Sequence, residues 1–223
     1  MKRITALILA VMATLTLTAC SNGESKESDS KADNSVSSTP ADNSSSATDS
    51  TDNKPSAYAD AVAVLDAAWS VYPEDDKFPI MGGSMDVAME YDGKPGPFTI
   101  SMTDEMGYNL KVPESIMPQV KSAASMIHMM NANTFTCGAF EVDGDINAFS
   151  TALVDSVNST QWMCGFPETV ITIKVDNYLI MAFGNGEIIE RFKTAATTAV
   201  TGASLVYEGP VSFGGGGIGL PPL

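Results

Sequence analysis

Thioether, amide and hydroxyl side chains gather around one histidine in the middle of the chain. These candidate binding residues are Met126, His128, Met129, Met130, Asn131, Asn133 and Thr134. Thioethers and imidazole are ligands for soft cations such as Cu(I) and Ag(I). Further methionines of the same character are Met81, Met85 and Met89. The segment is therefore a candidate soft-metal site or partner-binding surface, with core packing and turn formation as the structural alternatives.

The position of these side chains depends on the element that carries them. The apolar spacing predicts a helix over 113–133, in which Asn131 or Asn133 caps the C-terminus. At 100° per residue, Met126 and Met130 lie about 40° apart, and His128 lies on the opposite side. In a strand, all three would share one face. The predicted helix therefore weakens a joint metal site.

Catalysis by a histidine could use His128 alone, because the chain has no other histidine. The sequence contains neither the Gly-x-Ser-x-Gly elbow nor the His-Glu-x-x-His zinc motif. Paired carboxylates of a small carbohydrate-active enzyme stay an alternative, with Trp69 and Trp162 as sugar platforms. We expect a protein that is not an enzyme and that has no cofactor.

Three cysteines have two different predicted roles. Cys137 and Cys164 form an even pair in a segment expected to be exported, and this favours a structural disulfide. Two separately buried thiols are the alternative. Cys20 follows Leu17-Thr18-Ala19, and small residues before a cysteine form the lipobox of bacterial lipoproteins. We expect Cys20 to carry the lipid.

The N-terminal part reads as a signal and a tether. Residues 1–20 have a basic start and an apolar run too short to span a membrane, which predicts a lipoprotein signal peptide. Residues 21–56 hold twelve serines, seven acids and no aromatic residue, which predicts a disordered spacer. The domain is then expected in the cell envelope, on the extracytoplasmic side, attached to the membrane through Cys20.

The charge balance limits the class of partner. The chain has 27 acidic and 12 basic residues, a net charge of −15. Residues 57–223 hold 20 of the acids and 7 of the bases. This excess argues against nucleic acid and anionic lipid surfaces, and it suits a cationic partner or solubility alone.

The remaining pattern predicts one α+β domain over 57–208, with a mostly antiparallel sheet and packed helices. Helices are expected over 57–72, 113–133, 145–158 and 187–200. Strands are expected over 85–89, 98–102, 108–112, 134–142, 169–175 and 178–183. The C-terminal half therefore reads strand, helix, strand, strand, helix. Residues 209–223 are expected to form a Gly/Pro-rich tail, and loose packing is expected from about residue 202.

The segment Ala123–Ala139 (AASMIHMMNANTFTCGA) resembles one found in a family of uncharacterised bacterial lipoproteins, and residues 126–136 are its most specific part. The resemblance covers about 57–208. It implies an exported, lipid-anchored α+β protein and implies no reaction, because such families have no assigned activity.

These observations favour a lipid-anchored extracytoplasmic binding or protein-interaction module, with an envelope protein as its expected partner. The first alternative is a Cu(I)- or Ag(I)-binding protein that uses the methionine-rich segment. The second is a small carboxylate-dependent carbohydrate-active enzyme.

Overall fold

The computed structural model describes residues 56–163 and 165–212. In these residues, seven strands form one antiparallel sheet in the order β1-β3-β4-β6-β5-β7, and β2 pairs with β3 next to β1. The strands are β1 Ile80–Gly82, β2 Gly96–Phe98, β3 Val120–His128, β4 Phe135–Val142, β5 Thr169–Val175, β6 Tyr178–Gly184 and β7 Ser204–Pro210. The α-helices are α1 Ala61–Ser70, α2 Thr103–Asn109, α3 Ile146–Ser159 and α4 Gly186–Ala199. The predicted α+β fold is confirmed. Three short 3₁₀ helices, η1 Glu74–Asp76, η2 Ala88–Glu90 and η3 Met117–Gln119, lie between these elements.

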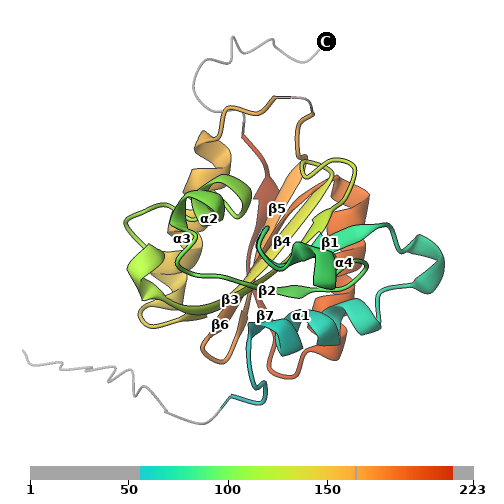
Figure 1. Ribbon diagram of the computed structural model, residues 1–223, viewed down its shortest axis with the longest axis horizontal. Helices are drawn as coiled ribbons and strands as arrows, with labels where there is room; N and C mark the ends of the chain where they lie inside the picture. Colours follow the sequence, from blue (N-terminus) through green and yellow to red (C-terminus); the bar gives the residue numbers. More distant parts are fainter. Residues whose placement is uncertain (1–55, 164, 213–223) are drawn as a thin grey trace, which may run out of the picture. The chain divides into compact units, whose positions relative to one another are not determined.

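The sheet is covered by helices on both faces (Figure 1). Helices α1 and α4 pack against one face around buried residues such as Leu65, Phe135 and Phe192. Helices α2 and α3 pack against the other face around Phe140 and Phe149. Within the described residues, no helix is long and apolar enough to cross a membrane.

Side-chain caps fix where the longer helices begin. Asp60, Asp145 and Asn185 each accept hydrogen bonds from backbone N–H groups of the first turn of α1, α3 and α4. The turn of the β5–β6 hairpin contains Asp176 in the left-handed region, with φ of 50°. The predictions for these three helices and the hairpin are confirmed, with ends shifted by a few residues.

The predicted helix over 113–133 is wrong, because residues 120–128 are β3, residues 117–119 are η3, and residues 129–133 belong to the β3–β4 connection. Both faces of β3 are covered by protein, so the neighbouring residues Ala123 and Ala124 are both buried. A strand buried on both faces loses the alternation of apolar and polar residues that identifies a strand. Asn131 and Asn133 are therefore in the β3–β4 connection and cap no helix.

Three predicted strands before β3 are also wrong or misplaced. Residues 85–89 form a turn and the start of η2. Of 98–102, only Phe98 belongs to a strand, β2, and 108–112 begin in the last residues of α2.

The predicted tail begins too early. Residues 204–210 form β7, an edge strand paired with β5. Val211 is buried, and its N–H donates to the carbonyl of Glu168 at 2.9 Å. Residues 213–223, the signal peptide with Cys20, and the predicted tether up to residue 55 lie outside the described residues.

Candidate functional site

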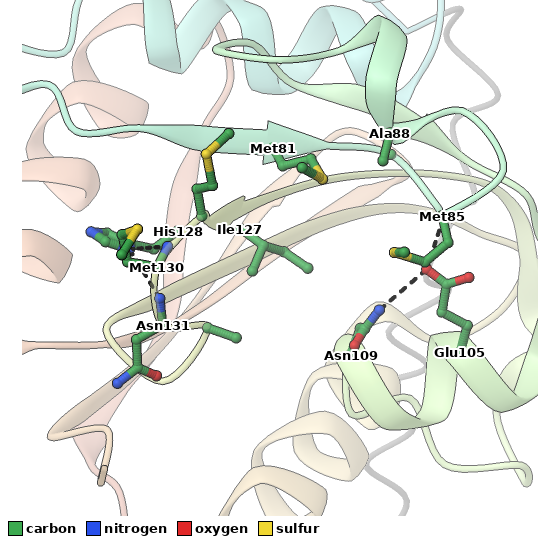
Figure 2. Close-up of a pocket in the computed structure, with 12 residues that line it drawn as sticks. Met81, Met85, Ala88, Glu105, Asn109, Ile127, His128, Met130 and Asn131 are labelled. Carbon is green, nitrogen blue, oxygen red and sulfur yellow. Dashed lines mark hydrogen bonds between the residues drawn. The ribbon is translucent and has the colours of Figure 1, made fainter. Parts of the chain in front are cut away.

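A pocket of about 230 Å³ lies where β1 meets β3, beside α2 and the β3–β4 loop (Figure 2). Its lining is Met81, Gly83, Met85, Ala88, Glu105, Asn109, Ile127, His128, Met129, Met130, Asn131 and Ala132. Four methionines from three separate segments thus line one pocket. We call it the methionine pocket.

The sheet and α2 position one half of this pocket. Met81 of β1 is the register partner of Ile127 of β3, so that their side chains lie on the same face of the sheet. Glu105 and Asn109 are one turn apart on α2, and Asn109 Nδ2 donates to Glu105 Oε1 at 3.2 Å. The same oxygen accepts from the backbone N–H of Met85 at 3.0 Å. Glu105 therefore ties the 84–87 turn to α2.

Several thioethers at the pocket face solvent. Met85 and Met130 are 70% and 81% exposed, and Met129 is 44% exposed. Isolated exposed apolar side chains are ordinary on protein surfaces, but several apolar side chains around one pocket indicate a binding surface. Methionine suits such a surface because its unbranched side chain repacks against different ligands.

His128 organises the loop that carries Met129 and Met130. Its Nδ1 accepts hydrogen bonds from the backbone N–H groups of Met130 and Asn131, at 3.1 and 3.3 Å. In the neutral ring the proton is then on Nε2, so neither nitrogen has a lone pair left for a metal or for a substrate proton. The ring also stacks on Phe78 with 5.2 Å between centroids. This geometry makes His128 a structural residue of the loop.

The other predicted site residues are divided between the core and the loop. Met126 is fully buried among α1 and α4 and does not line the pocket. Asn133 Nδ2 donates to the carbonyls of Met163 and Gly165, both at 3.0 Å, so it fastens the loop to the segment before β5. The carbonyl of Thr134 accepts from Asn185 N–H. Of the predicted set, His128, Met129, Met130 and Asn131 line the pocket.

Sequence reasoning missed the residues that complete the pocket. Glu105, Asn109 and Ile127 have no unusual sequence context, and no helix was predicted over 103–109. Met81 and Met85 were noted as methionines of the same character as those beside His128, but nothing in the sequence placed them next to that segment. The pairing of β1 with β3 places Met81 and Met85 beside residues 127–130. Spacing along the sequence does not reveal this pairing.

The cysteines give no support to the predicted disulfide. Cys137 is a free thiol in β4, and it is fully buried. Burial away from water raises the pKa of this thiol well above its ordinary value. Cys164 lies outside the described residues. Cys137 is therefore an inert packing residue in this structure, which agrees with the alternative of a buried thiol.

The part of the chain that the structure describes gives little support for a metal site of His, Cys, Asp and Glu or for a carboxylate pair that hydrolyses glycosides. There, no three His, Cys, Asp or Glu side chains come together to hold a metal ion. The methionine pocket contains one carboxylate, Glu105, and another pocket of about 290 Å³ beside α4 also contains one, Glu190. Neither pairs two carboxylates as glycoside hydrolysis requires. Trp69 and Trp162 are both buried, so they offer no exposed face for a sugar to stack on.

Comparison with models of protein families, with curated proteins and with solved structures finds no match to this chain. The resemblance to uncharacterised lipoproteins therefore stays a prediction.

Proposed function

We propose that this protein is a lipid-anchored extracytoplasmic binding module whose binding site is the methionine pocket. The observation that carries the proposal is the exposure of Met85, Met129 and Met130 around one pocket. Burial of these thioethers by a partner would contribute about 25 cal/mol of binding free energy for each Å² of apolar surface removed from water. The anchor at Cys20 would keep the domain at the membrane, where an envelope protein is the expected partner.

A site-specific crosslinking experiment tests the binding site. A photoreactive amino acid at position 130 of the full chain, expressed in its own envelope, should form a discrete adduct with a partner. The matched control is the same amino acid at Thr197, an exposed position of α4 on the opposite face of the sheet. Equal adducts from both positions, or none from position 130, would contradict the assignment of the pocket.

The anchor is tested separately. Metabolic labelling with a radioactive fatty acid should label the wild-type chain, and Cys20→Ala should abolish both the label and membrane retention. An unlabelled wild-type chain would remove the anchor from the proposal without affecting the binding site.

A soft-metal protein is the second candidate function, and the observation that favours it is that four thioethers line one pocket. The ligands would be Met81, Met85, Met129 and Met130. His128 is not among them, because its Nδ1 accepts two backbone hydrogen bonds and its Nε2 carries the proton of the neutral ring. Native mass spectrometry with Ag(I) should then show uptake at a defined stoichiometry. This uptake should fall in Met129→Ser with Met130→Ser and survive His128→Asn.

A further inference from the structure

The size of the methionine pocket indicates which kind of ligand it accepts. Pockets that enclose a whole drug-sized ligand measure about 300–1,000 Å³, whereas this pocket measures about 230 Å³. It therefore suits one or two anchoring side chains of a larger partner. Its lining is apolar except for a few polar groups, of which Glu105 is the one carboxylate. The anchoring side chains should accordingly be apolar.

At the edge of the sheet beside the pocket, β1 itself has no free side for an added strand. The outer side of β1 is already paired, because Gly82 N–H donates to the carbonyl of Tyr91 and Gly93 N–H donates to that of Ile80. Met81 also forms an antiparallel bridge with Asp92. The pairing of β1 favours a partner that binds through its side chains, as an amphipathic helix does when its apolar face enters a groove.

Acidic residues outnumber basic ones in the segments that form the pocket, and Glu105 is the acid in the lining itself. The acids of the turn, loop and helix that form its wall are Asp86, Glu90, Asp92, Asp104 and Glu105. Within residues 56–212, none of them forms an ion pair with a basic side chain. Lys94 is the one basic residue between positions 84 and 105, and its ammonium lies over the ring of Tyr91. The two hydrogen bonds to Glu105 both use Oε1, so that Oε2 can accept from a partner.

From these observations we infer that the occupant of the methionine pocket is a cationic amphipathic helix of another protein. Its apolar face enters between Met85 and Met130, and its Lys or Arg side chains contact Glu105 and the neighbouring carboxylates. This inference rests on the proposed function and names the chemistry of its partner. A second copy of this chain fits poorly, because it would bring the same excess of carboxylates to the contact.

The test uses the full chain, purified from membranes in non-ionic detergent, and fluorescence anisotropy of labelled model peptides. The probe is a helical peptide with leucines at three- and four-residue spacing on one face and lysines on the other. One comparison peptide carries Glu in place of Lys. Another has the Leu/Lys composition in an order without an apolar face. The Leu/Lys helix should bind tighter than both comparison peptides, and its binding should weaken as salt is added.

Matched variants separate pocket binding from general attraction to an acidic protein. Glu105→Gln should weaken binding about threefold or more, while Asp155→Asn, which removes the same charge from an exposed position of α3, should change it less than about twofold. Met85→Ser with Met130→Ser should weaken it about tenfold. Met163→Ser, at a methionine that is also exposed but does not line the pocket, should leave it unchanged.

Equal effects of each variant and its control would overturn the inference, because binding would then be general charge attraction. Equal binding of the Glu peptide would overturn it as well. Self-association of the chain that the Met85/Met130 variant abolishes would assign the pocket to a second copy instead. If the Leu/Lys helix fails while position 130 still crosslinks a partner, the inference fails and the proposed function stands. If both fail, the pocket is not the binding site.

Discussion

His128 offers a sharp test of how the methionine-bearing loop is held. Its side chain makes two separable contributions, the hydrogen bonds that Nδ1 accepts from Met130 and Asn131, and the stacking of the ring on Phe78. Phenylalanine at position 128 would keep the ring and lose the acceptor. Asparagine would keep an acceptor close to the same amides and lose the ring, since Asn side chains accept from N–H groups two or three residues later. Alanine would lose both contributions.

The expected magnitudes follow from these contacts. Two hydrogen bonds in a partly exposed loop contribute about 1–2 kcal/mol together, and the stacked ring pair contributes about 0.5–1.5 kcal/mol. His128→Phe should therefore lower the stability of the loop by about 1–2 kcal/mol and His128→Asn by about 0.5–1.5 kcal/mol, whereas His128→Ala should lower it by about 1.5–3.5 kcal/mol.

Hydrogen exchange of the Met130 and Asn131 amides reads out this loop directly, because it reports local opening as well as global unfolding. Exchange should accelerate most in His128→Ala, strongly in His128→Phe, and least in His128→Asn, which keeps an acceptor for the two amides. Denaturant unfolding of each variant measures the global part. Unchanged protection of both amides in His128→Phe would refute the acceptor role of Nδ1, and with it the argument that keeps His128 out of a metal site.

Four further predictions concern the core and the stability of the fold at alkaline pH. Phe135→Ala, which truncates a fully buried ring, should lower the free energy of unfolding by about 3–5 kcal/mol in denaturant titrations, and a cost below about 1 kcal/mol would contradict its place in the core. Cys137 should resist thiol reagents until the chain unfolds, so that native-state labelling as fast as in denaturant would contradict its burial. The fold keeps Cys137 protonated because its pKa is raised, whereas in the unfolded chain the thiol ionises near pH 8.5. The free energy of unfolding should therefore fall as pH rises above this value, and Cys137→Ala should show a shallower fall between pH about 8 and 9.5. Gly184→Ala should destabilise the domain, because a Cβ at Gly184 would lie 2.7 Å from the carbonyl carbon of Thr134 where φ is 156°, and unchanged thermal unfolding would contradict that contact.

The sequence could predict those elements whose signals are local. Helix α3 begins after a capping Asp145 and buries one stripe, and the alternating β5 and β6 join at a tight turn. Such features depend on residues a few positions apart, and they were predicted with the correct type. The fold class followed from the order of these elements.

The wrong predictions concern segments whose environment is set by residues far away in the sequence. In β3, Val120, Ala124 and Ile127 have the spacing of a helical stripe, yet the strand is covered on both faces and its pairing with β1, β2 and β4 decides its conformation. At β7 the opposite problem arises, because an edge strand with little burial has no apolar pattern to recognise.

The candidate site was half predicted for the same reason. Met129 and Met130 were found because they stand next to the histidine, and they do line the pocket. Because residues 113–133 were predicted to be a helix, His128 was placed on the side opposite Met126 and Met130. Met126 was grouped with Met130, although Met126 is in the core. Glu105 joins the site through tertiary packing of α2, which no spacing within the sequence encodes.

The way β1 and β2 share one side of β3 has a consequence for how the wall of the pocket can vary. The chain leaves the sheet after Gly83 and returns at Gly96, and these points adjoin, since a Cβ at Gly96 would lie 2.8 Å from the nitrogen of Gly83. Within this segment residues 91–93 pair back onto β1, so residues 84–90 form a loop that is closed at its base, and changes in its length cost little chain entropy. The loop carries Met85 and Ala88 of the pocket wall. Insertions or replacements in this loop would therefore reshape the wall of the pocket while the pairing of β3 with its neighbours is preserved.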